Sequence, residues 1–173
     1  MTIDNRPADE SLRRMQLNWP EAVTPVSRLM LRLFRLNKII QANAERCVQA
    51  EGLDFTEFQL LVMLRREPPP HELPPTELYQ HLQMSSGGIT KALKRLENSA
   101  FVERGVCETD RRSKPVRLTA KGCGAIERAM ADVLSSDGDL LRHGLNAEEL
   151  EQMITLLQRL MSAVDERDRS ASG

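Results

Sequence analysis

Apolar residues recur at intervals of three and four in two long stretches of the chain. This spacing predicts amphipathic α-helices, because it places the apolar side chains on one face. In the first stretch, residues 25–52, the repeating positions are Leu29, Leu33, Leu36, Ile40, Ala44 and Cys47. In the second stretch they are Leu150, Met153, Leu157, Leu160 and Val164. The second stripe is too narrow for a helix buried on all sides, and neither has an obvious place in a compact monomer. We therefore expect both to pack against a second copy of the chain, the first through Leu29, Leu33, Leu36 and Ile40.

Between these stretches, shorter patterns predict three further helices. Thr56–Gln59 has the form of a capping box, which marks the start of a helix. Pro75 fits the first turn of the next helix, where its fixed φ is favourable and its missing N–H is not needed. Ser85 or Ser86 can cap the third, SSGGITKALKRLE, after only a short turn. Two helices joined by so short a turn predict a helix-turn-helix.

The segment that follows predicts a hairpin and two more helices. Residues 101–104 and 116–118 are short strand candidates separated by a polar loop, which is the pattern of a β-hairpin. Thr119 can cap a helix over about residues 120–142, and Asn146–Glu149 is a second capping-box pattern. The expected fold class is mainly α with a small β-hairpin wing.

Charge is unevenly distributed along the chain. The 173 residues carry a formal net charge of −1, which gives no reason to expect a nucleic-acid partner from the whole molecule. Residues 85–121, however, hold nine basic and four acidic residues, so this segment carries +5 and the remainder −6. The neutral total hides a basic module. Aromatic residues make up only 3% of the chain, which disfavours a base-stacking platform for single strands.

The basic charge falls on one face of the helix expected at residues 86–98. A helical projection places Ile89, Ala92, Leu93 and Leu96 on the opposite, packing face. Unpaired N–H groups at the glycine-containing N-terminus can meet a phosphate, and the small residues allow a close approach to a duplex. We expect DNA contacts from this helix at Ser85, Ser86, Gly87, Thr90, Lys91, Lys94 and Arg95. In isolation, a solvated amphipathic helix would explain the same lysines; the helix-turn-helix context favours DNA.

Residues 56–122 resemble the winged helix-turn-helix of the MarR family of bacterial regulators. PPTELYQHLQMSSGGITKALKRLENSAFVER resembles its helix-turn-helix and ETDRRSKPVRLTAKG its wing signature. The resemblance implies that Asp110 and Arg112 form the acidic–basic pair that braces the wing, and that Arg111 or Arg112 enters the minor groove. Lys114 lies at the same hairpin tip and is a further expected DNA contact. Taken alone, Asp110–Arg112 would be read as an ordinary charged turn.

SSGGITKALKRLE and the preceding long helix resemble more narrowly the branch with urate-responsive regulators. The chain departs from that branch at Gln59, where an acidic residue is usual, and at Ala92, where arginine is usual. These changes remove the charged groups that would hold an anionic purine. We expect instead a small aromatic or phenolic effector near the junction of the dimerisation and DNA-binding regions. The candidate ligand-binding residues are Trp19, Gln59, Met63 and Tyr79, for each of which core packing is the simpler alternative.

These patterns together divide the chain into five regions. They are a flexible N-terminal arm at 1–18, an N-terminal dimerisation helix region at 19–52, a winged helix-turn-helix DNA-binding domain at 53–119, C-terminal dimerisation helices at 120–167 and a disordered tail at 168–173. The expected function is a homodimeric repressor that binds a palindromic operator in double-stranded DNA and is released by its effector. The alternatives are a protein-interaction dimer with a degenerate winged module and a cysteine-based redox-responsive regulator.

The sequence offers no pattern for an enzyme, a metal site or a cofactor. No nucleophile triad, carboxylate pair or phosphate-binding motif is present, and His71-Glu72 lacks a second histidine four residues on. Cys47, Cys107 and Cys123 show no paired spacing, although Cys107 adjoins the wing and could report oxidation. No apolar run approaches the roughly 18–20 residues that span a bilayer, and the N-terminus lacks a signal-peptide pattern. We therefore expect a cytoplasmic protein without a membrane partner.

Overall fold

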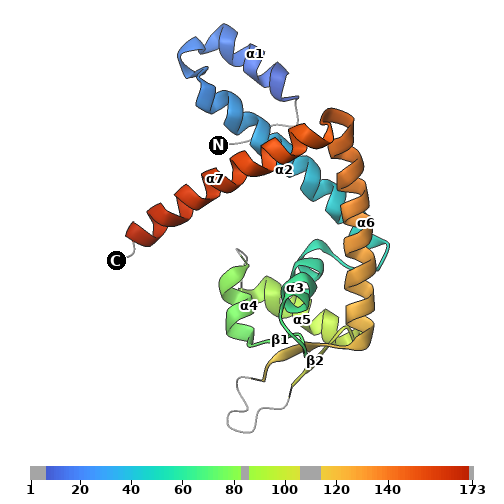
Figure 1. Ribbon diagram of the computed structural model, residues 1–173. Coiled ribbons are helices and arrows are strands. Elements are labelled where there is room, and N and C mark those ends of the chain that lie inside the picture. The colour runs from blue at the N-terminus through green and yellow to red at the C-terminus, as the bar shows by residue number, and fades with distance from the viewer. Residues whose placement is uncertain (1–6, 83–85, 106–113, 172–173) are drawn as a thin grey trace. The chain divides into compact units, whose positions relative to one another are not determined.

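The computed structural model describes residues 7–82, 86–105 and 114–171 (Figure 1). Its elements, in chain order, are α1 (Ala8–Asn18), the 3-10 helix η1 (Pro20–Ala22), α2 (Pro25–Gln49), α3 (Phe55–Arg66), β1 (Glu72–Leu73), α4 (Pro75–His81), α5 (Ser86–Asn98), β2 (Val102–Arg104), β3 (Val116–Leu118), α6 (Ala120–Gly144) and α7 (Ala147–Ala171). The chain divides into two units, residues 1–133 and residues 134–173. The expected fold class, mainly helical with a small β wing, is confirmed.

The N-terminal region contains a helix where the sequence predicted a flexible arm. Residues 8–18 form α1, which contacts α2, and Asp9 Oδ1 lies 2.6 Å from Arg32 Nη2 of α2. No residue of α1 is buried, and its only large apolar residues are Leu12, Met15 and Leu17, too few for a sustained stripe from which the helix could have been predicted. The expected disordered tail is also wrong in part, because α7 continues through residues 168–171.

The start of α3 differs from the predicted capping box. Asp54, and not Thr56, is the N-cap: its side chain accepts a hydrogen bond from the Glu57 N–H, and the Glu57 side chain accepts one from the Asp54 N–H. Thr56 already lies inside the helix. Both Asp54–Glu57 and Thr56–Gln59 have the sequence form of a capping box, and the extended backbone at Asp54 decides between them.

A three-stranded antiparallel sheet closes the compact part of the chain, with the strand order β1-β3-β2. The hairpin strands are confirmed, β2 starting one residue later than expected. The first strand, β1, was not predicted: it has two residues and pairs Glu72 with Arg117 and Leu73 with Val116. A pattern of alternating residues cannot be recognised over so short a length.

The core lies among α3, α4, α5, β3 and α6. Helix α3 contacts α5, β1 and β3, and α5 contacts β2 (Figure 1). The largest side chains that are fully buried are Leu60, Leu61, Leu64, Leu78, Ile89, Leu93, Leu96, Ile126, Val48 and Val116. The C-terminal end of α2 joins this core through Ala44 and Val48. This continuous apolar cluster fixes the positions of α3 and α5, the two helices on which the candidate site is built.

A glycine permits the close packing at the start of α6. A Cβ at Gly122 would lie 2.0 Å from the carbonyl oxygen of Phe101, so no larger residue fits without a backbone shift. The Thr119 hydroxyl accepts a hydrogen bond from the Gly122 N–H at 3.0 Å, which confirms the predicted cap. The first turn of α6 is thereby held against the turn that precedes β2.

The second unit comprises the end of α6, from Leu134, and α7. The predicted capping box at Asn146–Glu149 is confirmed by reciprocal hydrogen bonds of 2.9 and 3.0 Å. Among residues 147–170 every side chain is exposed except Leu150, which is half-buried. The predicted stripe of α7 is therefore uncovered in the single chain. No helix in the described residues combines the length and the apolarity needed to cross a membrane.

Candidate nucleic-acid interface

Helix α5 has the two faces that its sequence predicts. Ile89, Ala92, Leu93 and Leu96 are all buried in the core. Thr90, Lys91 and Lys94 are exposed on the other side. Neither lysine forms an ion pair with another residue of the described chain. The exposed side of α5 therefore presents two ammonium groups that no described residue neutralises.

No packing contact among the described residues requires a glycine at position 87. It is exposed in the first turn of α5, and a Cβ built there would meet no atom within 4 Å. A larger residue would therefore fit here without a clash. It would also favour the helix, because glycine costs helix stability relative to alanine. The space in front of Gly87 is open to an external molecule.

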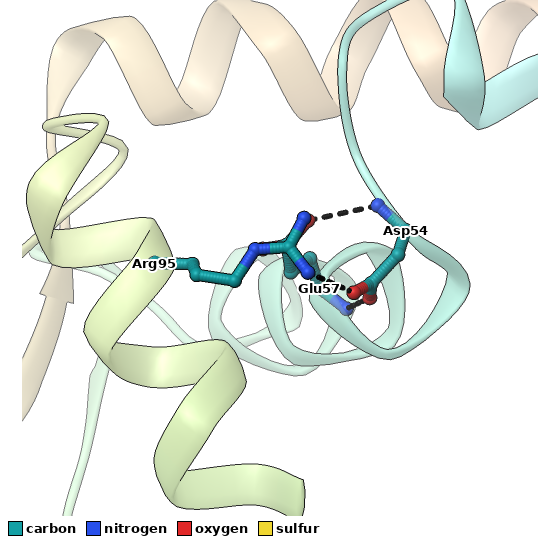
Figure 2. Close-up of polar contacts among 3 residues, drawn as sticks. All are labelled: Asp54, Glu57 and Arg95. Carbon is teal, nitrogen blue, oxygen red and sulfur yellow. Dashed lines mark hydrogen bonds and ion pairs between the residues drawn. The ribbon is translucent and has the colours of Figure 1, made fainter.

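Arg95 differs from the two lysines because its guanidinium forms ion pairs with residues at the start of α3. Its Nη1 lies 2.9 Å from Asp54 Oδ2 and its Nε lies 3.0 Å from Glu57 Oε1. Figure 2 shows the guanidinium reaching from α5 to both carboxylates at the start of α3. The sequence predicts a DNA contact at Arg95, whereas in the structure its guanidinium forms intramolecular ion pairs. Sequence reasoning missed the partners because Asp54 is 41 positions away.

A hydroxyl pair joins the neighbouring helix α4 to α5. Tyr79 Oη and Thr90 Oγ1 lie 3.0 Å apart, and either atom can be the donor. Tyr79 was expected to line an effector pocket, and Thr90 to contact DNA. The structure shows that Tyr79 supports the exposed face of α5 directly.

Several of the predicted contacts fall outside the described residues. Asp110, Arg111 and Arg112 of the wing lie there, as do Ser85, Cys107 and the side chain of Ser86. Lys114 is described: it is exposed and precedes β3. The described part of the wing is thus the paired strands β2 and β3 with Lys114 beside them.

A cavity of about 560 Å³ opens beside α3. Gln59 and Met63, two of the four predicted ligand-binding residues, line it together with Arg66; all three lie on one face of α3. The remaining lining residues are Phe55, Phe58, Val62, Glu67, Leu73, Glu77, Leu82 and Met130. The spacing of 59, 63 and 66 could have identified Arg66 from the sequence. Tyr79 is not among the lining residues, and neither is Trp19, which is 64% exposed.

The remaining reactive residues have ordinary structural surroundings. Cys47 and Cys123 are free thiols, partly buried against the core. His71 Nδ1 lies 2.6 Å from the Glu67 carbonyl oxygen, and His143 Nδ1 lies 3.0 Å from that of Asp139. Within residues 7–82, 86–105 and 114–171, no three histidine, cysteine or acidic residues are grouped closely enough to hold a metal ion.

The ion pair of Glu51 and Arg128, in the unit of residues 1–133, shifts the pKa of both residues. The carboxylate of Glu51 accepts two hydrogen bonds from Arg128, from Nε at 3.0 Å and from Nη2 at 2.8 Å. These bonds lower the pKa of Glu51 and raise that of Arg128. The pair links the segment after α2 to α6.

Comparison with known proteins gives the same fold. Residues 51–113 match the sequence model of the MarR family. The chain is 28% identical over 128 residues to the HTH-type transcriptional regulator PecS of Dickeya dadantii (strain 3937), covering 74% of this chain and 76% of that protein. The match to the family includes α3, α4, α5 and β2, the elements that carry the interface described above.

Two solved structures extend the likeness over most of the chain. The MarR family protein Rv2887 of Mycobacterium tuberculosis, in complex with salicylic acid, is 27% identical with a TM-score of 0.64, covering 81% of this chain and 98% of that one. Sco3205 of Streptomyces coelicolor, a MarR family transcriptional regulator in complex with DNA, is 21% identical with a TM-score of 0.65, covering 82% and 93%. At these scores the two proteins share the fold of this chain.

Proposed function

Since the chain carries a winged helix domain of the MarR family of transcriptional regulators, we propose that it is a homodimeric repressor of a palindromic operator in double-stranded DNA, released by a small aromatic or phenolic ligand. The observation that carries the proposal is the exposed face of α5. It combines Lys91 and Lys94, which have no intramolecular ion pair among the described residues, with Gly87, which no internal packing requires. The similar protein Sco3205 is in complex with DNA.

In this proposal, α5 enters the major groove from its glycine-containing end. Lysine contacts to phosphate supply affinity and register, while donors such as Thr90 and Lys91 reach base edges. Because Gly87 has no side chain, the backbone of the first turn can approach the duplex closely. Arg111, Arg112 and Lys114 of the wing are proposed contacts to the neighbouring groove and backbone, with Asp110 and Arg112 bracing the hairpin.

Two copies of the chain are needed to read a palindrome. The first apolar stripe includes Leu29, which is exposed, and Leu33, Leu36 and Ile40, which are half-buried. On α7, Met153, Leu157, Leu160 and Val164 are all exposed. We propose that these surfaces are covered in the dimer. Two-fold symmetry then sets the recognition helices about 34 Å apart, one turn of DNA.

The cavity beside α3 is the proposed effector site. Phe55, Phe58 and Met63 give it an apolar wall, and Gln59 and Arg66 supply polar groups. An aromatic ring suits this wall, while the Gln59 amide can donate to or accept from a phenolic hydroxyl. Ala92, the other departure from the urate-responsive branch, is buried, so it offers a purine no polar contact. The similar protein Rv2887 is in complex with salicylic acid.

Footprinting of DNA that flanks the protein's own gene tests the proposed function. A protected palindrome at moderate salt is expected, together with loss of protection for Lys91→Ala/Lys94→Ala. That double variant removes exposed charges only, so its unfolding should match that of the wild type. If no palindrome is protected, the repressor proposal fails and the protein-interaction alternative gains support.

A thermal-shift screen of small phenolic and purine acids tests the effector. A ligand that binds the native state raises its unfolding temperature by mass action. The active compound should also release the protected operator, and Gln59→Ala should weaken both effects. A strong shift with urate would contradict the assignment.

A further inference from the structure

The strongest unassigned feature is the carboxylate cluster that Arg95 joins at the start of α3. Glu57 is buried, with only 4% of its side chain exposed, and both of its oxygens have partners. Oε2 accepts a hydrogen bond from the Asp54 N–H at 2.8 Å, and Oε1 lies 3.0 Å from Arg95 Nε. The other arm of the guanidinium donates to Asp54 Oδ2 at 2.9 Å (Figure 2). One side chain of α5 therefore ties together both members of the α3 capping box.

The burial of Glu57 makes its contact with Arg95 different from an ordinary surface ion pair, although 51% of the Arg95 side chain is exposed. Exposed pairs contribute little, because water and salt screen them. Breaking a pair that contains a buried carboxylate leaves that charge without compensation. The planar guanidinium meets two carboxylates at once through differently directed N–H groups, which an ammonium group cannot reproduce. Arg95 is thus held by two carboxylates, whereas its neighbour Lys94 has no ion pair among the described residues.

The position of Arg95 on α5 gives this restraint a consequence for the exposed face. Arg95 lies about one turn after Lys91 and next to Lys94, so its ion pairs add a restraint on the rotation of α5 to the one that its buried apolar face already provides. The Tyr79–Thr90 hydroxyl pair restrains the same helix closer to its N-terminus. The rotation of α5 determines which side chains would face base edges.

We infer that Arg95 is a positioning residue, which sets the orientation of α5 through Glu57 and Asp54 and does not itself bind phosphate. This inference rests on the proposed DNA-binding function. Phosphate contacts tolerate a small rotation of the helix, whereas base-edge contacts require a fixed geometry. Loss of the Arg95 contacts therefore lowers affinity for the operator and leaves affinity for unrelated DNA nearly unchanged.

The test compares Arg95→Lys with Lys94→Gln in the full-length protein, on operator and on unrelated DNA across a salt series. Arg95→Lys keeps the charge but loses the two-armed geometry. It should reduce operator affinity by about 10- to 100-fold, the range expected for a misplaced contact group, with an unchanged salt slope. Lys94→Gln should weaken both DNAs and reduce the slope by about one unit.

Two further variants separate positioning from general loss of structure. Asp54→Asn retains an efficient N-cap for α3 while weakening the Arg95 contact, so it should fold normally and lose specificity in the same direction. In Arg95→Lys/Glu57→Gln, the second change should add little to the specificity loss if Arg95 acts through Glu57. Unfolding curves establish that each variant is folded under the binding conditions.

The outcomes distinguish this inference from the proposed function. If the wild type shows no preference for any DNA, both fail. If the wild type binds its operator and the folded Arg95→Lys and Asp54→Asn variants keep its specificity ratio, only the positioning role is overturned. A reduced salt slope for an uncharged substitution, Arg95→Gln, equal to that of Lys94→Gln would instead make Arg95 a phosphate contact.

Discussion

The winged domain and helix α7 have similar apolar periodicity but opposite burial. In the winged domain, apolar residues of α3, α4 and α5 pack against one another, and Leu64, Leu78 and Ile89 are fully buried. In α7 the stripe is exposed from Met153 to Val164, and only Leu150 at its start is half-buried. Both regions begin helices with well-formed capping boxes, at Asp54 and at Asn146. Local helix formation is thus equally well specified in the two regions.

The difference shows what amphipathic periodicity establishes and what it omits. An apolar stripe specifies the side of a helix that needs to be buried. Whether another segment of the same chain or a second molecule buries it depends on which apolar surfaces the tertiary fold brings next to it. In the winged domain, other helices of the same chain bury the apolar stripes. For α7, we propose that a second copy of the chain buries the stripe.

The largest expected effect is on the uncovered stripe. Leu157→Asp places a charge in the proposed dimer contact, where desolvating it is costly, so we expect monomer or aggregate and no specific DNA binding. Sedimentation and operator binding measure both effects. Thr155→Asp is the matched control, because it adds the same charge on the opposite side of α7. A Leu157→Asp dimer with native operator affinity would show that the stripe is not the interface.

In the covered region, a core truncation should act on folding. Leu64 is fully buried, and Leu64→Ala should lower the free energy of unfolding by about 2–5 kcal/mol through lost burial and a cavity. Leu17→Ala, at a position 75% exposed on α1, should change it by less than about 0.5 kcal/mol. Denaturant unfolding compares the two. Equal effects would contradict the burial contrast on which the comparison depends.

A substitution at Gly87 tests an exposed position on a helix whose other face is buried in the core. Gly87→Val meets no atom of the chain and tolerates a helix better than glycine, so the stability should not fall. Operator affinity should nevertheless fall by about tenfold, equivalent to about 1.4 kcal/mol, because the side chain blocks the close approach. Unfolding and operator titration are measured on the same preparation. Intact affinity would refute the close-approach explanation.

The smallest effect concerns the surface pair of Glu51 and Arg128. Because the pKa of Glu51 is lowered in the folded protein, its contribution to stability is complete above the unfolded value of about 4.3 and is lost as the pH falls through the lower folded value. Thermal unfolding from pH 7 to pH 3 should therefore depend less on pH in Glu51→Gln than in the wild type. Identical pH profiles would mean that the pair does not stabilise the fold.

Sequence patterns predicted the helices and hairpin of the winged domain well, and the supporting contacts poorly. The buried face of α5 followed directly from its periodicity, and Thr119 capped α6 as expected. The cap of α3 was placed two residues late because Asp54 and Thr56 both begin a valid capping box. Helix α1 was missed because its only large apolar residues are Leu12, Met15 and Leu17, too few for a sustained period.

The candidate sites show the same division. The exposed lysines of α5 followed from its periodicity, whereas Gln59 and Met63, which line the cavity, were expected at a ligand site from the family resemblance. The role of Tyr79 was not predicted, because its partner Thr90 lies on another helix. Strand β1 was likewise invisible, since its two residues become a strand only by pairing with β3.

The sequence by itself determined the buried face of α5, the caps of α6 and α7 and the basic character of the module, because these depend on residues close together in the chain. Only the tertiary structure decided that Arg95 binds Glu57 and Asp54 while the adjacent Lys94 remains exposed. The two cations are neighbours with similar local surroundings on α5. Their difference arises because packing α3 against α5 brings carboxylates from a distant part of the chain within reach of one of them.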